Sequence, residues 1–163
     1  MIKGMYIFGA SGTGTTTIGR ELCKVLDFTH LDCDDFCWYE TDPPFTQRRS
    51  IKESQNLLLR EINKSYKWVM SGSLCKWGDI VLDYLDLVIY IWIPTDTRIK
   101  RIEKRDREKY GDKILVNRDM FDGYSRYIEN ASNYDSGSFN VNSKLQHEIW
   151  LRQLQCPILL FKK

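Results

Sequence analysis

The stretch Gly9-Ala10-Ser11-Gly12-Thr13-Gly14-Thr15-Thr16 has the glycine spacing of a Walker A phosphate-binding loop. Gly9 and Gly14 stand five residues apart, and Thr16 takes the place of the hydroxyl that ligates Mg²⁺ in such loops. Thr15 stands where the motif has a lysine, so it cannot place a positive charge on the β- and γ-phosphates of a nucleotide. The loop is therefore predicted to bind phosphate through its backbone, with the cation supplied from elsewhere in the chain.

The segments on either side of the loop fit a strand before it and a helix after it. An apolar run over Met5–Phe8 leads into the loop, and Ile18, Leu22 and Val25 recur beyond it at helical spacing. A helix that starts there directs its free N–H groups and the positive end of its dipole at an anion in the loop. This order predicts a nucleotide phosphate site formed by Gly9, Ala10, Ser11, Gly12, Thr13, Gly14, Thr15, Thr16 and Thr17.

The composition is that of an ordinary globular domain. The 163 residues, 42% hydrophobic and 28% charged, are enough for one domain with a real core over residues 1–163. The net charge of +2 favours neither nucleic acid nor a membrane as partner, and no apolar run has the length of a membrane span. The first residues read as a strand rather than a signal peptide, and the five cysteines are scattered, which favours reduced thiols and a cytoplasmic location.

Apolar and amphipathic segments alternate along the whole chain. The predicted strands are Met5–Phe8, Phe28–Asp32, Lys67–Ser71, Leu87–Ile93 and Pro157–Phe161. The predicted helices, besides the one after the loop, are Thr46–Asn63, Thr95–Lys109, Arg118–Ala131 and one from the capping pattern at Ser143 to about Leu154. This alternation predicts a three-layer α/β domain of the P-loop type, in which ligands bind at the carboxyl ends of the strands.

An acidic cluster, Asp32-Cys33-Asp34-Asp35, follows the second predicted strand. If the segment is extended, Asp32 and Asp34 point the same way, and carboxylates near the Thr16 hydroxyl suit Mg²⁺. Alternatively, Asp34 accepts the proton of a substrate hydroxyl. The competing interpretation is a solvated acidic turn that caps the next segment. We expect Asp32 and Thr16 to serve the metal, and Asp34 to serve the substrate or the reaction.

Two further segments border the same edge of the predicted sheet. The aromatic and proline-rich stretch 36–45, which includes Trp38, either stacks on a flat substrate or packs over the core. The third strand ends at Ser71-Gly72-Ser73, where many phosphate-loop enzymes have a metal-binding aspartate and this chain has none. Gly72 allows a ligand to approach the backbone closely, so Gly72 and Ser73 are candidate substrate contacts.

A basic segment follows the fourth predicted strand. Arg98, Arg101 and Arg105 fall within about 60° of one another on a helical wheel. Such a face is usually solvated and paired with nearby carboxylates. Yet unit charges about 4 Å apart are worth roughly 4 kcal/mol at an effective dielectric of 20, which a phosphate-transferring site needs. We therefore expect Arg101 and Arg105 to close over the loop and replace the charge of the missing lysine.

Together these features resemble the small P-loop kinases of the adenylate kinase type, including an uncharacterised branch of AAA domains with the loop Gly-x-Ser-Gly-x-Gly-Thr-Thr-Thr. Cytidylate and shikimate kinases are similar, and some cytidylate kinases also have threonine at the lysine position. The matching segments are the loop through Thr17, Asp32–Asp35, Thr41–Thr46, Ser71–Asp79, Arg101 with Arg105, Asp119-Met120 and His147–Leu151.

The resemblance implies a five-stranded parallel sheet of order 2-3-1-4-5, a lid over about residues 101–142, and phosphoryl transfer from ATP with Mg²⁺ as cofactor. Nucleoside monophosphate kinases usually bind the acceptor phosphate through an arginine after the second strand, and Arg48 and Arg49 are placed for that role. The acceptor itself stays open: a nucleotide, or a small hydroxyl metabolite as in shikimate and gluconate kinases. The competing functions are a nucleotide-binding regulatory module without turnover and a plain NTPase.

Overall fold

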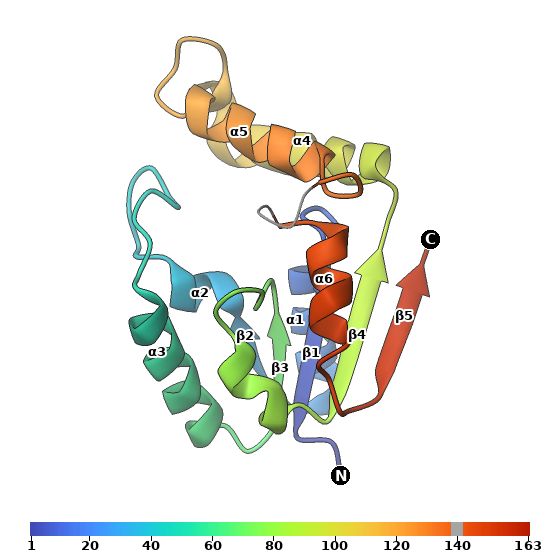
Figure 1. Cartoon of the computed structure of the whole chain (residues 1–163). Helices are drawn as coiled ribbons and strands as arrows, with labels where there is room; N and C mark the ends of the chain where they lie inside the picture. The colour runs from blue at the N-terminus through green and yellow to red at the C-terminus, as the bar shows by residue number, and fades with distance from the viewer. Residues whose placement is uncertain (138–141) are drawn as a thin grey trace.

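A parallel sheet of five strands lies at the centre of the computed structural model, which describes residues 1–137 and 142–163 (Figure 1). The strands are β1 (Gly4–Gly9), β2 (Thr29–Asp32), β3 (Trp68–Ser71), β4 (Leu87–Trp92) and β5 (Ile158–Lys162). They lie in the order β2-β3-β1-β4-β5, and every neighbouring pair is parallel. The predicted fold class and strand order are therefore confirmed.

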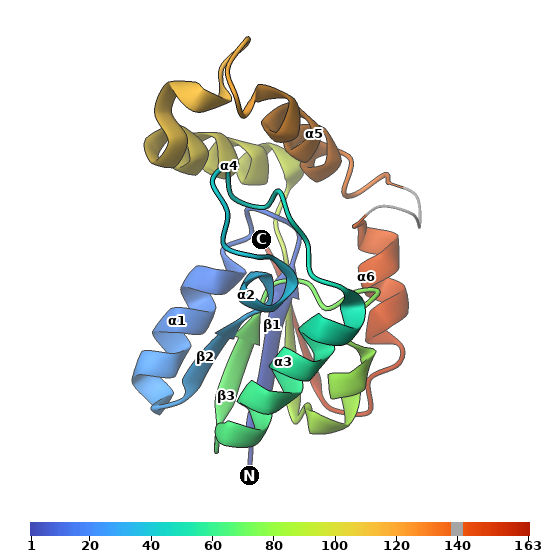
Figure 2. The same ribbon diagram turned by 90° about the vertical axis from the view of Figure 1, so that its left-hand side faces the viewer.

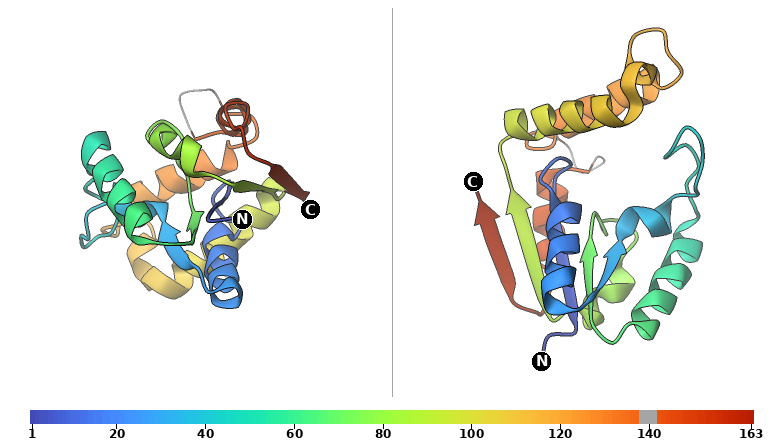
Figure 3. Two further views of the ribbon diagram at one scale, coloured as in Figure 1. Left: turned by 90° about the horizontal axis from the view of Figure 1, so that it is seen from below. Right: turned by 180° about the vertical axis from the view of Figure 1, so that it is seen from behind.

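Helices cover both faces of this sheet. Helix α1 (Thr15–Leu26) lies on one face, seen from behind in Figure 3. Helices α3 (Ile51–Lys64) and α6 (Lys144–Leu151), together with the short 3₁₀ helix η1 (Asp79–Tyr84), lie on the other. The capping pattern at Ser143 is confirmed, because its hydroxyl accepts a hydrogen bond from the Gln146 N–H. The described residues contain no helix long and apolar enough to cross a membrane.

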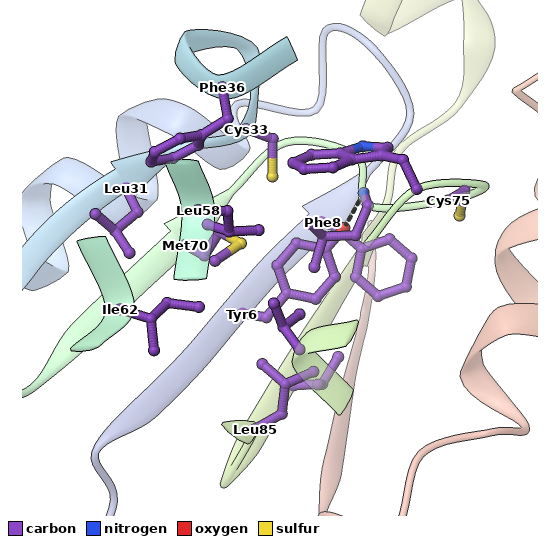
Figure 4. Close-up of a cluster of buried hydrophobic side chains, with 14 of the residues drawn as sticks. Tyr6, Phe8, Leu31, Cys33, Phe36, Leu58, Ile62, Met70, Cys75 and Leu85 are labelled. Carbon is purple, nitrogen blue, oxygen red and sulfur yellow. Dashed lines mark hydrogen bonds between the residues drawn. The ribbon is translucent and has the colours of Figure 1, made fainter. Parts of the chain in front are cut away.

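The alternation of side chains along β1 divides the core between the two faces. Tyr6 and Phe8 point into the larger apolar cluster (Figure 4). Within it, the ring of Phe8 lies against Trp150 of α6 at a centroid distance of 5.7 Å. Met5 and Ile7 belong to the second cluster, which packs against α1. Because β1 is buried on both faces, the loop that follows Gly9 starts from a fixed point.

Two helices that lie side by side extend across the carboxyl ends of the strands (Figure 2). They are α4 (Thr95–Tyr110) and α5 (Phe121–Ser132), joined through the 3₁₀ helix η2 (Gly111–Ile114). The described part of the expected lid consists of these elements and the residues around them, while residues 138–141 lie outside the described residues. The glycine after α4, Gly111, has φ 55° and lets the chain turn there.

The segment after β2 differs from the prediction. Residues Cys33–Cys37 form a short helix, α2, rather than an extended chain, because the Asp32 carboxylate accepts a hydrogen bond from the Asp34 N–H and caps it. The next helix begins at Ile51 rather than Thr46, with Ser50 as its cap. Between the two, residues 38–49 form a hairpin where the sequence predicted a loop and, from Thr46, a helix. The hairpin is closed by hydrogen bonds from Tyr39 N to Gln47 O and from Arg49 N to Cys37 O.

Candidate active site

The phosphate loop has the backbone that an anion site requires. Gly12 and Gly14 have φ of 84° and 90°, a region that favours glycine. The carbonyl oxygen of Ala10 accepts hydrogen bonds from the backbone N–H of Thr13 at 3.2 Å and from its hydroxyl at 2.7 Å. No side chain among the described residues caps α1 at Gly14. The N–H groups of its first turn are therefore available to phosphate oxygens.

Three polar side chains form a chain of contacts beside the loop. The Thr16 hydroxyl lies 3.5 Å from the Ser71 hydroxyl, which lies 3.0 Å from Nε2 of His30. Burial lowers the pKa of His30, which favours the neutral ring. The sequence reasoning missed both His30 and Ser71. The signal for Ser71 was its place at the end of β3, where a metal-binding carboxylate was sought instead of a hydroxyl.

The oxygen donors at these strand ends suit Mg²⁺. Asp32 ends β2 and pairs in register with Ser71 of β3, so both belong to the same edge as Thr16. The residues described include no cluster of three His, Cys, Asp or Glu side chains that would hold a metal. Mg²⁺ needs only one or two protein oxygens because it keeps several waters, so Thr16 and Asp32 fit it. Asp32 also caps α2 and lies 4.0 Å from the guanidinium of Arg20.

Asp34 combines an exposed surface with a perturbed carboxyl group. It lies in the first turn of α2. Desolvation raises the pKa of Asp34 to about 6, and the charges of Asp32 and Asp35 add to that rise. The charge of Arg105 and a hydrogen bond from Trp38 oppose it. A carboxyl group whose pKa is shifted this far and which solvent can still reach is typical of a functional site. Its pKa suits proton transfer near neutral pH.

The arginines of α4 have two different environments. Arg105 is held by Asp106, whose carboxylate lies 2.7 Å from Nε, and by the hydroxyl of Tyr127 at 3.3 Å. This ion pair raises the pKa of Arg105, which is therefore a fixed cation on α4. Arg101 is exposed. The third arginine of the expected basic edge was misplaced, because Arg98 is fully buried and faces the interior.

The two arginines after α2 also differ. Arg49 donates from Nη1 to the backbone oxygens of Asp35 and Phe36 at 3.0 and 3.4 Å and to that of Trp38, and its guanidinium lies over the ring of Tyr39. It closes the carbonyl end of α2 and the base of the hairpin, and its role in binding the acceptor stays a prediction. Arg48 is exposed, with its guanidinium 5.7 Å from the centre of the Trp38 ring.

The end of β3 brings the last two expected contacts to the same region. Gly72 has φ 106°, and a Cβ there would lie 2.8 Å from Cβ of Cys33. The absence of a side chain at Gly72 therefore lets this turn pack closely against α2. Its carbonyl accepts a hydrogen bond from Tyr6 at 2.8 Å. The Ser73 hydroxyl donates to the side-chain oxygen of Asn142 at 3.4 Å. Ser73 therefore connects the end of β3 to the start of α6.

Three thiols lie beneath this edge of the sheet. Cys33, Cys37 and Cys75 are buried in the larger apolar cluster. Burial raises the pKa of Cys33 well above its ordinary value, and raises the pKa of Cys37 and of Cys75 to about 11. These groups are therefore protonated packing residues at neutral pH.

The chain matches known proteins over most of its length. Residues 6–130 match the family described as AAA domain. The uncharacterized protein YqaC of Bacillus subtilis (strain 168) is 40% identical over 159 residues, which are 98% of this chain and 88% of that protein. A cytidylate kinase of Pyrobaculum islandicum is 25% identical over 150 residues, 83% of this chain and 78% of the relative. The solved shikimate kinase of Bacteroides thetaiotaomicron has the same fold, with a TM-score of 0.52 at 13% identity over 97% of this chain and 86% of that one.

Proposed function

The chain belongs to the AAA domain family and to its small P-loop kinases, and from this premise we propose that it transfers the γ-phosphoryl group of ATP to a small-molecule acceptor. The observation that carries the proposal is the phosphate loop, in which Gly12 and Gly14 have positive φ and which leads into an α1 that no described side chain caps. The acidic turn at the start of α2 follows β2 at the same end of the sheet, and α4, which carries Arg105, lies across that end (Figure 2).

In the proposed reaction, the acceptor oxygen attacks the γ-phosphorus, the bond from that phosphorus to the bridging oxygen breaks, and ADP leaves. When the acceptor is a hydroxyl group, Asp34 takes its proton, whereas the phosphate oxygen of a nucleoside monophosphate attacks as an anion and needs no base. In both cases Arg105 and Arg101 stabilise the charge that develops on the transferring group. The backbone N–H groups of residues 9–17 hold the phosphates. Mg²⁺ supplies charge neutralisation when bound, with Thr16 and Asp32 as its protein ligands.

The acceptor is proposed to contact Trp38, Arg48 and Ser73, with Gly72 shaping the backbone there. The exposed Arg48, stacked on Trp38, suits a phosphate or carboxylate carried on a ring. A nucleoside monophosphate is therefore the first candidate, and the similarity to a cytidylate kinase supports it. A hydroxylated acid is the second.

Two measurements test this function. ATP with Mg²⁺ should stabilise the folded protein by about 2.7 kcal/mol at a hundredfold excess over Kd, and the melting temperature should rise accordingly. ADP release should then depend on the acceptor in a panel of nucleoside monophosphates, shikimate and gluconate. ATP binding without acceptor-dependent turnover would instead indicate the regulatory module, and turnover indifferent to every acceptor would indicate a plain NTPase.

A further inference from the structure

The guanidinium of Arg98 joins the phosphate loop to the lid. Nη1 donates to the carbonyl oxygens of Ser11 at 3.3 Å and Ala131 at 3.1 Å. Nε donates to the carbonyl of Ile93 at 3.0 Å, and Nη2 donates to the Thr95 hydroxyl at 2.8 Å. A single buried side chain therefore contacts the loop, the end of β4, the start of α4 and α5.

The contact with Ser11 bears directly on phosphate binding. The peptide between Ser11 and Gly12 is trans, so its C=O and N–H point in opposite directions. Because the carbonyl is directed at Arg98, the N–H of Gly12 points away from the guanidinium. The preceding carbonyl, that of Ala10, is occupied by Thr13. Both carbonyls are thus held by protein donors, and the N–H of Gly12 is left for an anion.

The backbone of Arg98 fixes the loop a second time. Gly12 packs directly on the first turn of α4, since a Cβ at Gly12 would lie 2.6 Å from the carbonyl oxygen of Arg98. Gly12 also has φ 84°, which disfavours any other residue. The loop therefore has little room to move away from Arg98.

The carboxylate that pairs with Arg98 is itself partly exposed to solvent. Asp135 lies 3.5 Å from Nη2, with a side chain that is 33% exposed. Its carboxylate oxygens also accept hydrogen bonds from Trp92 Nε1 and from the Thr95 hydroxyl, each at 2.7 Å. A guanidinium buried behind the loop acts through a medium of low polarity.

We propose that Arg98 is the positioning residue that supplies the fixed positive charge of this phosphate loop, acting from behind through the Ser11–Gly12 peptide in place of the lysine replaced by Thr15. This inference rests on the proposed nucleotide binding at the loop. Unlike the contribution of Arg101 and Arg105, it requires no movement of the lid and acts on binding in the ground state.

The test compares ATP affinity, measured by calorimetry, in charge-keeping and charge-removing variants. Arg98→Gln should raise the Kd for ATP at least tenfold, and Arg98→Lys should raise it less, because it keeps the charge. Adding Thr15→Lys should lower the Kd for ATP much more in Arg98→Gln than in wild type, because only that variant lacks the fixed charge. An equal gain in both backgrounds would indicate a purely structural role of Arg98. Equal losses in the Lys and Gln variants, with no restoration by Thr15→Lys, would overturn the inference.

A second pair of variants applies if the Arg98 variants do not fold. Asp135→Asn removes the counter-charge and leaves Arg98 in place, so the Kd for ATP should fall severalfold. Glu129→Gln removes an equal charge from α5 without an ion pair to Arg98 in the described structure and is the matched control. If both variants change the Kd equally, the inference fails. Wild-type protein that binds ATP without turnover would contradict the proposed kinase and leave this inference standing.

Discussion

The hydroxyl oxygen of Ser71, at the end of β3, lies 3.5 Å from that of Thr16, the proposed Mg²⁺ ligand in the first turn of α1. Because Ser71 stands where a metal-binding carboxylate is often found, we expect its hydroxyl to hold a water of the metal. Ser71→Ala should raise the Mg²⁺ concentration that gives half-maximal activity by about tenfold, an effect of about 1.4 kcal/mol. Ser54→Ala, a buried serine on α3, is the control and should leave this concentration unchanged.

With a hydroxyl acceptor, Asp34→Asn should lower kcat by at least about 100-fold, because general base catalysis contributes about 10² to 10⁴ in rate. Steady-state kinetics with the acceptor found in the panel would measure it. Asp35→Asn, one residue further along α2, is the matched control and should have a much smaller effect. Wild-type turnover by the Asp34 variant would mean that the acidic cluster is only the cap of α2.

The perturbed carboxyl also predicts a pH-dependent stability in metal-free buffer. The pKa of Asp34 rises on folding from its ordinary 3.8 to about 6, so the folded state binds the proton more tightly. Its contribution therefore favours the folded state at low pH and is lost as pH rises from about 4 to about 6. Above that range Asp34→Asn should be more stable than wild type, by no more than about 1 kcal/mol because the group keeps an exposed surface. Urea unfolding at pH 4 and pH 7 measures the difference, and a larger gain at pH 4 would contradict it.

The lid arginines should act mainly on the transition state. Arg101→Ala and Arg105→Ala should each lower kcat by more than tenfold and change the Kd for ATP by less than about threefold, because their contacts strengthen as charge develops. Lys100→Ala, an exchange on the same helix, is the control. A variant that loses ATP affinity in parallel with kcat would place that arginine in ground-state binding.

Replacing Arg48 and Arg49 by lysine, one at a time, should affect different properties of the protein. Arg49→Lys removes the fork that holds the carbonyls of α2, so it should lower the free energy of unfolding by about 1 to 2 kcal/mol. Arg48→Lys should leave stability within about 0.5 kcal/mol, as surface exchanges do, and raise the KM for an anionic acceptor. Denaturant unfolding and acceptor kinetics check the two results. The opposite pattern would make Arg49 the acceptor residue.

The sequence predicted two kinds of element. One kind is buried along its whole length, and the other is determined by residues close together in the sequence. β4 reads as an apolar run because both of its faces are covered, and the loop before α1 is specified by glycines at fixed spacing. The hairpin over residues 38–49 escaped prediction because its hydrogen bonds join residues whose pattern has no strand period. The environment of Arg98 escaped for another reason. Its partners Ser11 and Ala131 lie 87 and 33 residues away in sequence, so only the folded chain brings them together.

The reactivity of the buried thiols beneath the strand ends reports local opening of the domain. Cys33 and Cys75 are shielded from reagents and kept protonated by burial, so a thiol probe reacts with them only when that part of the domain opens. Their labelling rate therefore counts opening events directly below the ligand edge. A bound nucleotide that holds α2 and the turn after β3 closed would lower the rate of thiol labelling. The native cysteines would then report nucleotide binding without a label in the site itself.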